Sequence, residues 1–176
     1  MSLLKRNQPP SPEQISASAR SVIETVRETG LSPESTLIMG GSALALAGLR
    51  PAGDVDLIIP EYVYHSIRYN TPYATPSGMR LRLKAHTIYP VLETYDKPRQ
   101  EDIMHVDITT PKRDYGSDAE FETELRQYEM FEGYPFLPPD LVLERKMRSA
   151  ERNRKKDRDD IDLVWKHLEE MKRDGN

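Results

Sequence analysis

Three aspartates have the residue type and the spacing to bind a divalent metal ion. Asp54 and Asp56 are two residues apart at the start of an aliphatic run, Asp54-Val55-Asp56-Leu57-Ile58-Ile59. Alternate side chains of a β-strand leave the same face of the sheet, so both carboxylates would point to one side. Asp107 lies on the polar face of a second predicted strand. Three carboxylates on neighbouring strands supply the oxygen ligands that Mg²⁺ prefers, although an Asp-x-Asp pair taken alone is also common on surface strands.

A glycine-rich turn upstream of these aspartates has the composition of a phosphate-binding loop. Gly40, Gly41 and Ser42 follow a predicted strand over 36–39 and precede a predicted helix over 43–47, so backbone N–H groups and the helix dipole would face the loop. The glycines leave room for a triphosphate, and the Ser42 hydroxyl can donate to a phosphoryl oxygen. Taken alone, Gly-Gly-Ser is more often an ordinary tight strand-to-helix turn. It lacks the Gly-Lys-Ser/Thr of a P-loop, and the chain has no Gly-x-Ser-x-Gly hydrolase motif.

The composition excludes several other classes of protein. The 176 residues carry 25 Lys and Arg against 29 Asp and Glu, a formal net charge of −4, so a basic coat for nucleic acid is excluded. The absence of cysteine excludes a disulfide scaffold, a thiolate nucleophile and cysteine-ligated metal sites. No stretch resembles a signal peptide or a membrane span. We therefore expect a cytoplasmic protein without a membrane partner.

The elements that would position these residues follow from hydrophobic periodicity and from Gly and Pro boundaries. The predicted helices cover 12–30, 43–47 and a short segment after 61, and the predicted strands cover 36–39, 54–59, 79–89 and 103–109. Residues 121–130 fit a helix or a strand, and a long helical tail begins at Pro139. We expect an α/β (α+β-like) fold with a small mixed sheet flanked by helices. It would comprise a flexible arm (1–11), a core (12–135) and a C-terminal helical portion packed on that core (136–176).

Histidines and aromatic residues carry weaker signals. The four histidines show no metal-ligand spacing; His105, two residues before Asp107, is expected to be a partly exposed strand residue rather than part of a pocket. The tyrosines between 62 and 73 could stack on a base, although such residues more often cover a sheet edge. We expect Trp165 to lie in the core with Val164 and Leu168.

The glycine turn and the aspartates occur in an order found in a known family. An apolar strand, Gly41-Ser42, eleven residues and then Asp54-Val55-Asp56, with Asp107 downstream, resembles the DNA polymerase β-like nucleotidyltransferase superfamily. The form of residues 39–46, Met-Gly-Gly-Ser-Ala-Leu-Ala-Leu, is most similar to the branch of abortive-infection (AbiEii-like) nucleotidyltransferase toxins. The C-terminus also resembles the helical motif of that branch, through Lys146, Arg152, Lys156-Asp157 and Asp160-Ile161-Asp162-Leu163.

This resemblance implies a metal-dependent nucleotidyltransferase that moves a nucleoside monophosphate from an NTP to an acceptor hydroxyl and releases pyrophosphate. The residues it assigns to catalysis and metal binding are Asp54, Asp56 and Asp107, and those it assigns to nucleotide binding are Gly40, Gly41, Ser42 and Lys146. The cofactor would be Mg²⁺, as two ions, with Mn²⁺ as the alternative. A toxin-type enzyme would act on tRNA or protein. Two other interpretations stay open: a small-molecule (antibiotic-type) nucleotidyltransferase, and a non-catalytic relative that binds nucleotide or nucleic acid.

A basic segment lies within the predicted helical tail. Residues 144–158 contain eight cations (Arg145, Lys146, Arg148, Arg152, Arg154, Lys155, Lys156 and Arg158) and three acids (Glu144, Glu151 and Asp157). A solvated helix face is one interpretation. The other is a nucleic-acid acceptor, which we favour slightly because one or two cations suffice for a triphosphate.

Overall fold

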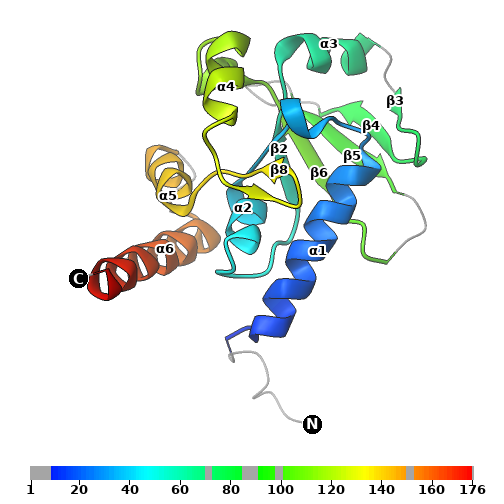
Figure 1. The fold of residues 1–176 in the computed structure, drawn as a ribbon. Coiled ribbons are helices and arrows are strands. Elements are labelled where there is room, and N and C mark those ends of the chain that lie inside the picture. The colour runs from blue at the N-terminus through cyan, green and yellow to red at the C-terminus, as the bar shows by residue number, and fades with distance from the viewer. Residues whose placement is uncertain (1–8, 70–72, 85–90, 98–100, 150–152, 176) are drawn as a thin grey trace.

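A mixed sheet forms the centre of the molecule (Figure 1). The structure, a computed structural model, describes residues 9–69, 73–84, 91–97, 101–149 and 153–175. Within these ranges six strands pair in the order β1-β2-β6-β5-β4-β3. Only β2 and β6 are parallel among the described neighbours. The strands are β1 (Leu37–Met39), β2 (Val55–Ile58), β3 (Tyr73–Ala74), β4 (Arg80–Leu83), β5 (Leu92–Asp96) and β6 (Val106–Thr109).

Helices precede, separate and follow these strands. They are α1 (Pro12–Glu28), α2 (Gly40–Leu46), α3 (Glu61–Tyr69), α4 (Asp118–Leu125), α5 (Pro139–Arg148) and α6 (Lys155–Asp174), with 3₁₀ turns at Pro33–Ser35 and Pro111–Arg113. The start of α1 is the predicted one: the Ser11 hydroxyl accepts from the Gln14 N–H, and the Gln14 side chain accepts from the Ser11 N–H. This capping box satisfies two N–H groups at the helix end.

Alternating burial on β2 and β6 separates the core from the polar face of the sheet. Val55 and Leu57 on β2 are fully buried, and so is Val106 on β6. These side chains pack with buried residues of α1 and α2 in one hydrophobic core. Asp56 and Asp107 stand between buried neighbours, so they leave the opposite face. The predicted mixed α/β fold and the two strands that carry the aspartates are confirmed.

Other predicted elements are shorter, or are joined by elements that were not predicted. The strand predicted over 79–89 is described as β4, and residues 85–90 lie outside the described ranges. Strand β5 was not predicted, because Leu92 is its one aliphatic side chain. The segment 121–130 is divided between α4 and the short strand β7 (Met130–Phe131), which pairs with β8 (Tyr134–Pro135). Of the predicted arm, residues 1–8 lie outside the described part of the chain.

The C-terminal tail is two helices rather than one. Helix α5 is followed by Ser149 and α6 is preceded by Arg154. Both flanking residues have extended backbone. The two helices pack against each other, and α5 also contacts α2. Residues 150–152 between them, including Arg152 of the helical motif, lie outside the described ranges. The break lets the start of α6 approach the sheet instead of continuing the direction of α5 (Figure 1).

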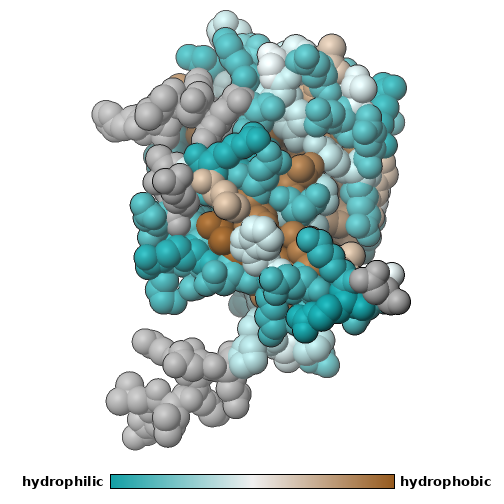
Figure 2. All heavy atoms as spheres, turned by 90° about the vertical axis from the view of Figure 1, so that its left-hand side faces the viewer, coloured by the Kyte–Doolittle hydropathy of each residue, from teal (hydrophilic) through white to brown (hydrophobic). Residues whose placement is uncertain are grey.

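The prediction that Trp165 lies in the core is wrong. Its residue surface is 46% exposed, whereas Val164 is fully buried and Leu168 is half-buried. Successive side chains of a helix are about 100° apart, so the residue beside the buried Val164 is turned outward. Figure 2 shows the side of the molecule on which α5 and α6 lie, where apolar side chains occupy the middle of a mostly hydrophilic face.

No helix within the described residues has the length and the apolar character needed to cross a membrane.

Candidate functional site

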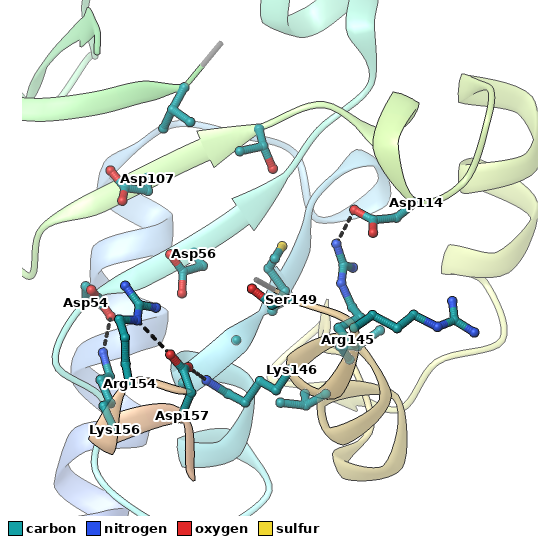
Figure 3. A pocket seen from close by; sticks show the side chains of 18 of the residues that line it. Asp54, Asp56, Asp107, Asp114, Arg145, Lys146, Ser149, Arg154, Lys156 and Asp157 are labelled. Carbon is teal, nitrogen blue, oxygen red and sulfur yellow. Dashed lines mark hydrogen bonds and ion pairs between the residues drawn. The ribbon is translucent and has the colours of Figure 1, made fainter. Parts of the chain in front are cut away.

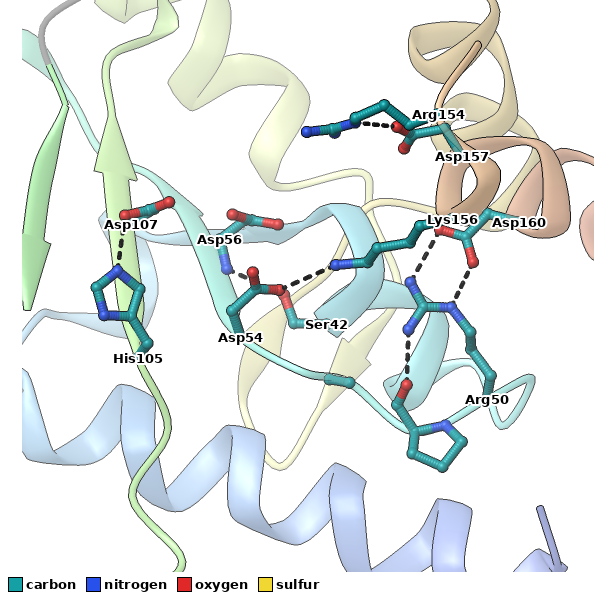
Figure 4. A network of polar contacts seen from close by, with 12 residues as sticks. Ser42, Arg50, Asp54, Asp56, His105, Asp107, Arg154, Lys156, Asp157 and Asp160 are labelled. Carbon is teal, nitrogen blue, oxygen red and sulfur yellow. Dashed lines mark hydrogen bonds and ion pairs between the residues drawn. The ribbon is translucent and has the colours of Figure 1, made fainter. Parts of the chain in front are cut away.

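The parallel pairing of β2 and β6 brings the predicted aspartates together. Asp56 lies opposite Asp107 in the register, and the Val55 N–H donates to the His105 carbonyl at 2.8 Å. Asp54 directly precedes β2. All three line a single pocket of about 770 Å³, and their carboxylates lie on the side of the sheet that faces away from α1 (Figures 3 and 4). The geometry therefore gathers the three residues from two strands into one place.

The Asp56 carboxyl carries the strongest electrostatic signal of the site. Burial raises its pKa to about 7, helped by the negative charges of Asp54 and Asp107, while Lys156 and Lys146 act in the opposite direction. Ionised carboxylates that lie close together repel one another, so the charge on each disfavours ionisation of its neighbour. A site with this excess of negative charge and only oxygen donors suits a hard divalent cation.

A second group of possible metal ligands shares Asp107. Within the described residues, the three acidic or histidine side chains whose ligand atoms all lie within 4.8 Å of one another are Glu93, His105 and Asp107. Asp54, Asp56 and Asp107 are spread more widely than that, so one ion held by all three requires their carboxylates to move closer. Lys84 Nζ lies 3.6 Å from Glu93 Oε2 and 3.7 Å from Asp107 Oδ2, and it partly neutralises the second group.

Both glycines of the turn line the pocket, and each leaves room for a neighbouring charged group. Gly40 has φ +60, and a Cβ there would lie 2.5 Å from Asp56 Oδ2. A Cβ on Gly41 would lie 2.5 Å from Arg50 Nη2. Because real Cβ contacts are longer than this, a side chain at either position would displace its neighbour. The absence of side chains at Gly40 and Gly41 thus leaves space for Asp56 and Arg50 as well as for any phosphate.

The Ser42 hydroxyl is not placed as the phosphate-binding hypothesis expects. It is fully buried, donates to the Met39 carbonyl at 2.6 Å and accepts from the Asp56 N–H at 3.2 Å. Ser42 is not among the described residues that line the pocket. A hydroxyl near the start of a helix readily bonds to a local carbonyl, which accounts for this arrangement. In this structure the hydroxyl ties the turn to the strand that carries Asp56.

Lys146 lines the pocket and lies at the centre of a group of ion pairs. Its Nζ donates to Asp157 Oδ1 at 2.6 Å and lies 2.9 Å from Asp160 Oδ2. Burial lowers the Lys146 pKa, but its hydrogen bonds to the two aspartates outweigh that effect, and the net pKa is raised. Arg50 donates from Nε and Nη2 to Asp160 at 2.5 and 2.8 Å. Sequence reasoning missed Arg50, because nothing in its surroundings along the chain indicates a partner 110 residues away.

The cations of the basic segment are largely paired with carboxylates. Arg145 pairs with Asp114, Arg148 with Glu144, Lys155 with Asp159 at 2.9 Å, and Lys156 with Asp54 at 3.7 Å. The described lining of the pocket is close to balanced, with six cations (Lys84, Arg145, Lys146, Arg148, Arg154 and Lys156) and five acids (Asp54, Asp56, Asp107, Asp114 and Asp157). The number of cations therefore overstates the positive charge that this segment offers to a nucleic acid.

Histidine and tyrosine side chains contribute less to the pocket. His105 is 39% exposed by side chain, and its Nε2 lies 3.2 Å from Asp107 Oδ1. Of the tyrosines considered for base stacking, Tyr62, Tyr64 and Tyr69 are absent from the described lining, and the side chain of Tyr73 lies outside what the structure describes. The geometry therefore offers no stacking platform from these three residues.

Comparison with protein-family models finds no match, and comparison with curated proteins finds none either. Among solved structures, the chain is similar to the Cid1 poly(U) polymerase at 13% sequence identity and a TM-score of 0.38, over 60% of this chain and 33% of that one. It is also similar to the Megavirus polyadenylate synthase at 13% identity and a TM-score of 0.42, over 93% of this chain and 32% of that one. The chain spans about a third of the length of either protein.

Proposed function

We propose that this chain is a metal-dependent nucleotidyltransferase, which transfers a nucleoside monophosphate from an NTP to an acceptor hydroxyl and releases pyrophosphate. The observation that carries the proposal is the register of Asp56 opposite Asp107 on two parallel strands, beside a glycine turn. The pocket that they line, about 770 Å³, falls within the usual range for small-molecule sites, roughly 300–1,000 Å³.

The donor set fits the expected cofactor, Mg²⁺ as two ions or alternatively Mn²⁺. Asp54, Asp56 and Asp107 provide oxygen ligands only, and the pKa of Asp56 is raised to about 7 by burial first and then by the charges of Asp54 and Asp107. When bound, the ions would supply charge neutralisation for the attacking and leaving oxygens of an in-line displacement. Lys156 Nζ lies 3.7 Å from Asp54 Oδ1 and partly balances the charge of that carboxylate.

The chemical step forms one bond and breaks one. The acceptor oxygen bonds to the α-phosphorus, the bond from that phosphorus to the oxygen bridging to the β-phosphate breaks, and pyrophosphate leaves with the bonding electrons. Asp107 is our candidate to take the proton of the acceptor hydroxyl. The backbone of Gly40 and Gly41 would hold the triphosphate, and Lys146 would stabilise its negative charge. Ser42 would have to turn away from the Met39 carbonyl to take part.

The acceptor belongs to the same proposal. The motifs at residues 39–46 and 146–163 support a toxin-type enzyme that acts on tRNA or protein in the cytoplasm. A small-molecule acceptor is the alternative. Because cations of the basic segment are paired with carboxylates, the preference for a nucleic-acid acceptor is weaker than the number of cations in the sequence suggests.

The test is transfer of label from each α-labelled NTP to tRNA, protein and small-molecule acceptors, with Mg²⁺ or Mn²⁺ present. We expect labelled product from the parent protein and a loss of at least about 100-fold in Asp107→Asn, because that change removes a ligand and the proton acceptor. Asp159→Asn is the matched control, since Asp159 is an exposed acid outside the described pocket lining. Nucleotide binding without any transfer would show a non-catalytic relative and contradict the proposal.

A further inference from the structure

A network of charged side chains lies beside the glycine turn and joins it to the last two helices (Figures 3 and 4). Within the described residues it comprises Arg50, Lys146, Arg154, Asp157 and Asp160, which we call the Arg50 network. Asp160 accepts from both Arg50 and Lys146, and Asp157 accepts from Lys146 and from Arg154 Nε at 2.7 Å. The network therefore connects the loop before β2 with α5 and α6.

Most of this network is shielded from water. The side chains of Asp160 and Asp157 are 3% and 6% exposed, and those of Lys146 and Arg50 are 15% and 18% exposed. Charges in such a setting are screened weakly, so the balance between cations and acids matters. The two buried carboxylates are matched by two shielded cations, Arg50 and Lys146, whereas the Arg154 side chain is 58% exposed. Lys146 and Arg154 also line the pocket.

Arg50 has one defined position in the network. Its Nε and Nη2 engage both oxygens of Asp160, and its Nη1 donates to the Pro51 carbonyl at 2.6 Å. A guanidinium that makes a two-pronged contact with a carboxylate is held in orientation as well as in place. The missing side chain of Gly41 leaves the space that Nη2 needs. Arg50 itself is not among the described residues that line the pocket.

We propose that Arg50 is a positioning residue for triphosphate binding: by satisfying Asp160 from behind, it keeps Lys146 at the pocket wall with positive charge to offer an anion. The inference rests on the proposed function and names a residue of the same site that acts through another. Without Arg50, Lys146 would be the one shielded cation of the described network facing both acids, and it would be the main partner of Asp160. The positive charge of Lys146 would then be neutralised within the network and would be less available to a ligand.

The direction of the pKa values agrees with this division of charge. Burial raises the pKa of Asp160, but hydrogen bonds from Arg50 and then Lys146 outweigh that effect and lower it overall. Asp160 is thus an ionised acid that needs compensation, and Arg50 supplies the larger share of it.

Variants that change the net charge of the Arg50 network provide the test. The probe is magnesium tripolyphosphate, titrated by calorimetry into the parent and its variants, so that the readout is binding rather than turnover. Arg50→Met removes one positive charge from the network and is expected to weaken binding by roughly tenfold. Asp160→Asn removes one negative charge instead and should bind at least as tightly as the parent. The double variant Arg50→Met/Asp160→Asn restores the net charge of the parent network, and should recover to within about threefold of the parent.

Two controls separate positioning from folding. Lys155→Met removes an exposed cation outside the described pocket lining, and its affinity should equal that of the parent. Urea unfolding of every variant is measured alongside, because Arg50→Met alone leaves the buried Asp160 with one partner fewer, and affinities are compared only under conditions in which each variant is folded. Arg50→Lys keeps the charge but not the two-pronged contact, and it should fall between the parent and Arg50→Met.

The outcomes also separate this inference from the proposed function. If the parent transfers nucleotide but Arg50→Met binds magnesium tripolyphosphate as the parent does, the positioning role is overturned and the enzyme assignment stands. A double variant that binds no better than Arg50→Met, or that fails to fold, overturns the role as well. A parent that neither transfers nucleotide nor binds tripolyphosphate contradicts both.

Discussion

Asp56 combines a proposed metal-binding position with an unfavourable charge. Its pKa is raised to about 7, first by burial and then by Asp54 and Asp107, so the folded protein holds this proton more tightly than the unfolded chain does. Between pH 4 and 7 the folded state therefore binds more protons at this site, and its contribution to stability falls as pH rises. The carboxylate is retained at a cost that a bound cation would relieve.

We predict that Asp56→Asn stabilises the metal-free protein at pH 8. Replacing an ion by a neutral amide of similar shape removes the repulsion, and we expect a gain on the order of 1–3 kcal/mol in the free energy of unfolding. The gain should be small at pH 4, where the parent carboxyl is protonated in the folded state. Urea unfolding with a chelator at both pH values measures it. Equal stability of parent and variant at pH 8 would contradict the strained carboxylate.

Metal binding should depend on pH in the opposite sense. A cation competes with the proton on Asp56, so saturating Mg²⁺ should raise the melting temperature more at pH 8 than at pH 6. In Asp56→Asn this difference between the two pH values should largely disappear. A metal effect that is the same at both pH values in the parent would place the ion away from Asp56.

Strand alternation, which depends only on near neighbours, predicted that Asp54 and Asp56 share a face and that Asp107 lies on the polar face of its own strand, and the family resemblance joined the two strands. Sequence reasoning could not find Arg50, whose partner Asp160 is 110 residues away. It also read Ser42 as a phosphate donor, whereas that hydroxyl bonds to Met39 and to the Asp56 N–H. Both of these findings depend on which backbone and side-chain groups the folded chain brings into reach, and no local pattern encodes them.

At the scale of the element, the glycine turn leaves space for two charged side chains that pack against it. Both of its glycines lie where a Cβ would press on a charged side chain, Asp56 for Gly40 and Arg50 for Gly41. The turn thus controls the place of a carboxylate on one side and of a guanidinium on the other.

We predict that Gly41→Ala weakens magnesium tripolyphosphate binding through Arg50. The added methyl group would displace Nη2, so the loss should resemble that of Arg50→Met and should not add to it in the double variant. Gly53→Ala is the matched control, because a Cβ there meets nothing within 4 Å. Losses that add fully would show that Gly41 contacts the ligand independently of Arg50.

The C-terminal helices show where periodicity is informative and where it is not. A long helical tail was predicted, and the residues are helical, but the extended backbone at Ser149 and Arg154 divides the tail. Apolar residues on α6 were expected to be buried together, yet α6 buries a narrow stripe that includes Asp157, Asp160 and Val164. Burial of two aspartates on this face follows from their ion pairs, which hydrophobic periodicity does not detect.

We predict that Trp165→Ala costs little stability. The residue is 46% exposed, so the loss should be below about 1 kcal/mol, compared with about 3–5 kcal/mol for a core aromatic residue. Val164→Ala, at a fully buried neighbour, should cost more despite the smaller change in volume. Urea unfolding of both variants decides the order, and a larger loss for Trp165→Ala would show that its ring packs against the protein.

At the scale of the whole molecule, charge pairing outweighs net charge. The chain carries a formal −4, yet cations and acids line the described pocket in nearly equal numbers because basic side chains of α5 and α6 face acids of the sheet and loops. The mixed sheet was predicted from its strands, but its order was not, because β5 went unrecognised and separates β4 from β6. Order in a sheet depends on pairings between distant segments, which local patterns leave open.

The single parallel pairing among the described strands has a consequence for how the protein matures. Positions 56 and 107 face each other across β2 and β6, with the chain of β3, β4 and β5 between them in sequence. Closing so long a loop costs conformational entropy before contacts between the strands stabilise the pair, so such pairings form slowly. During synthesis Asp54 and Asp56 leave the ribosome well before Asp107. If the proposed function holds, a nascent chain would therefore lack the complete set of aspartates until β6 pairs with β2, and activity would begin only with the completed sheet.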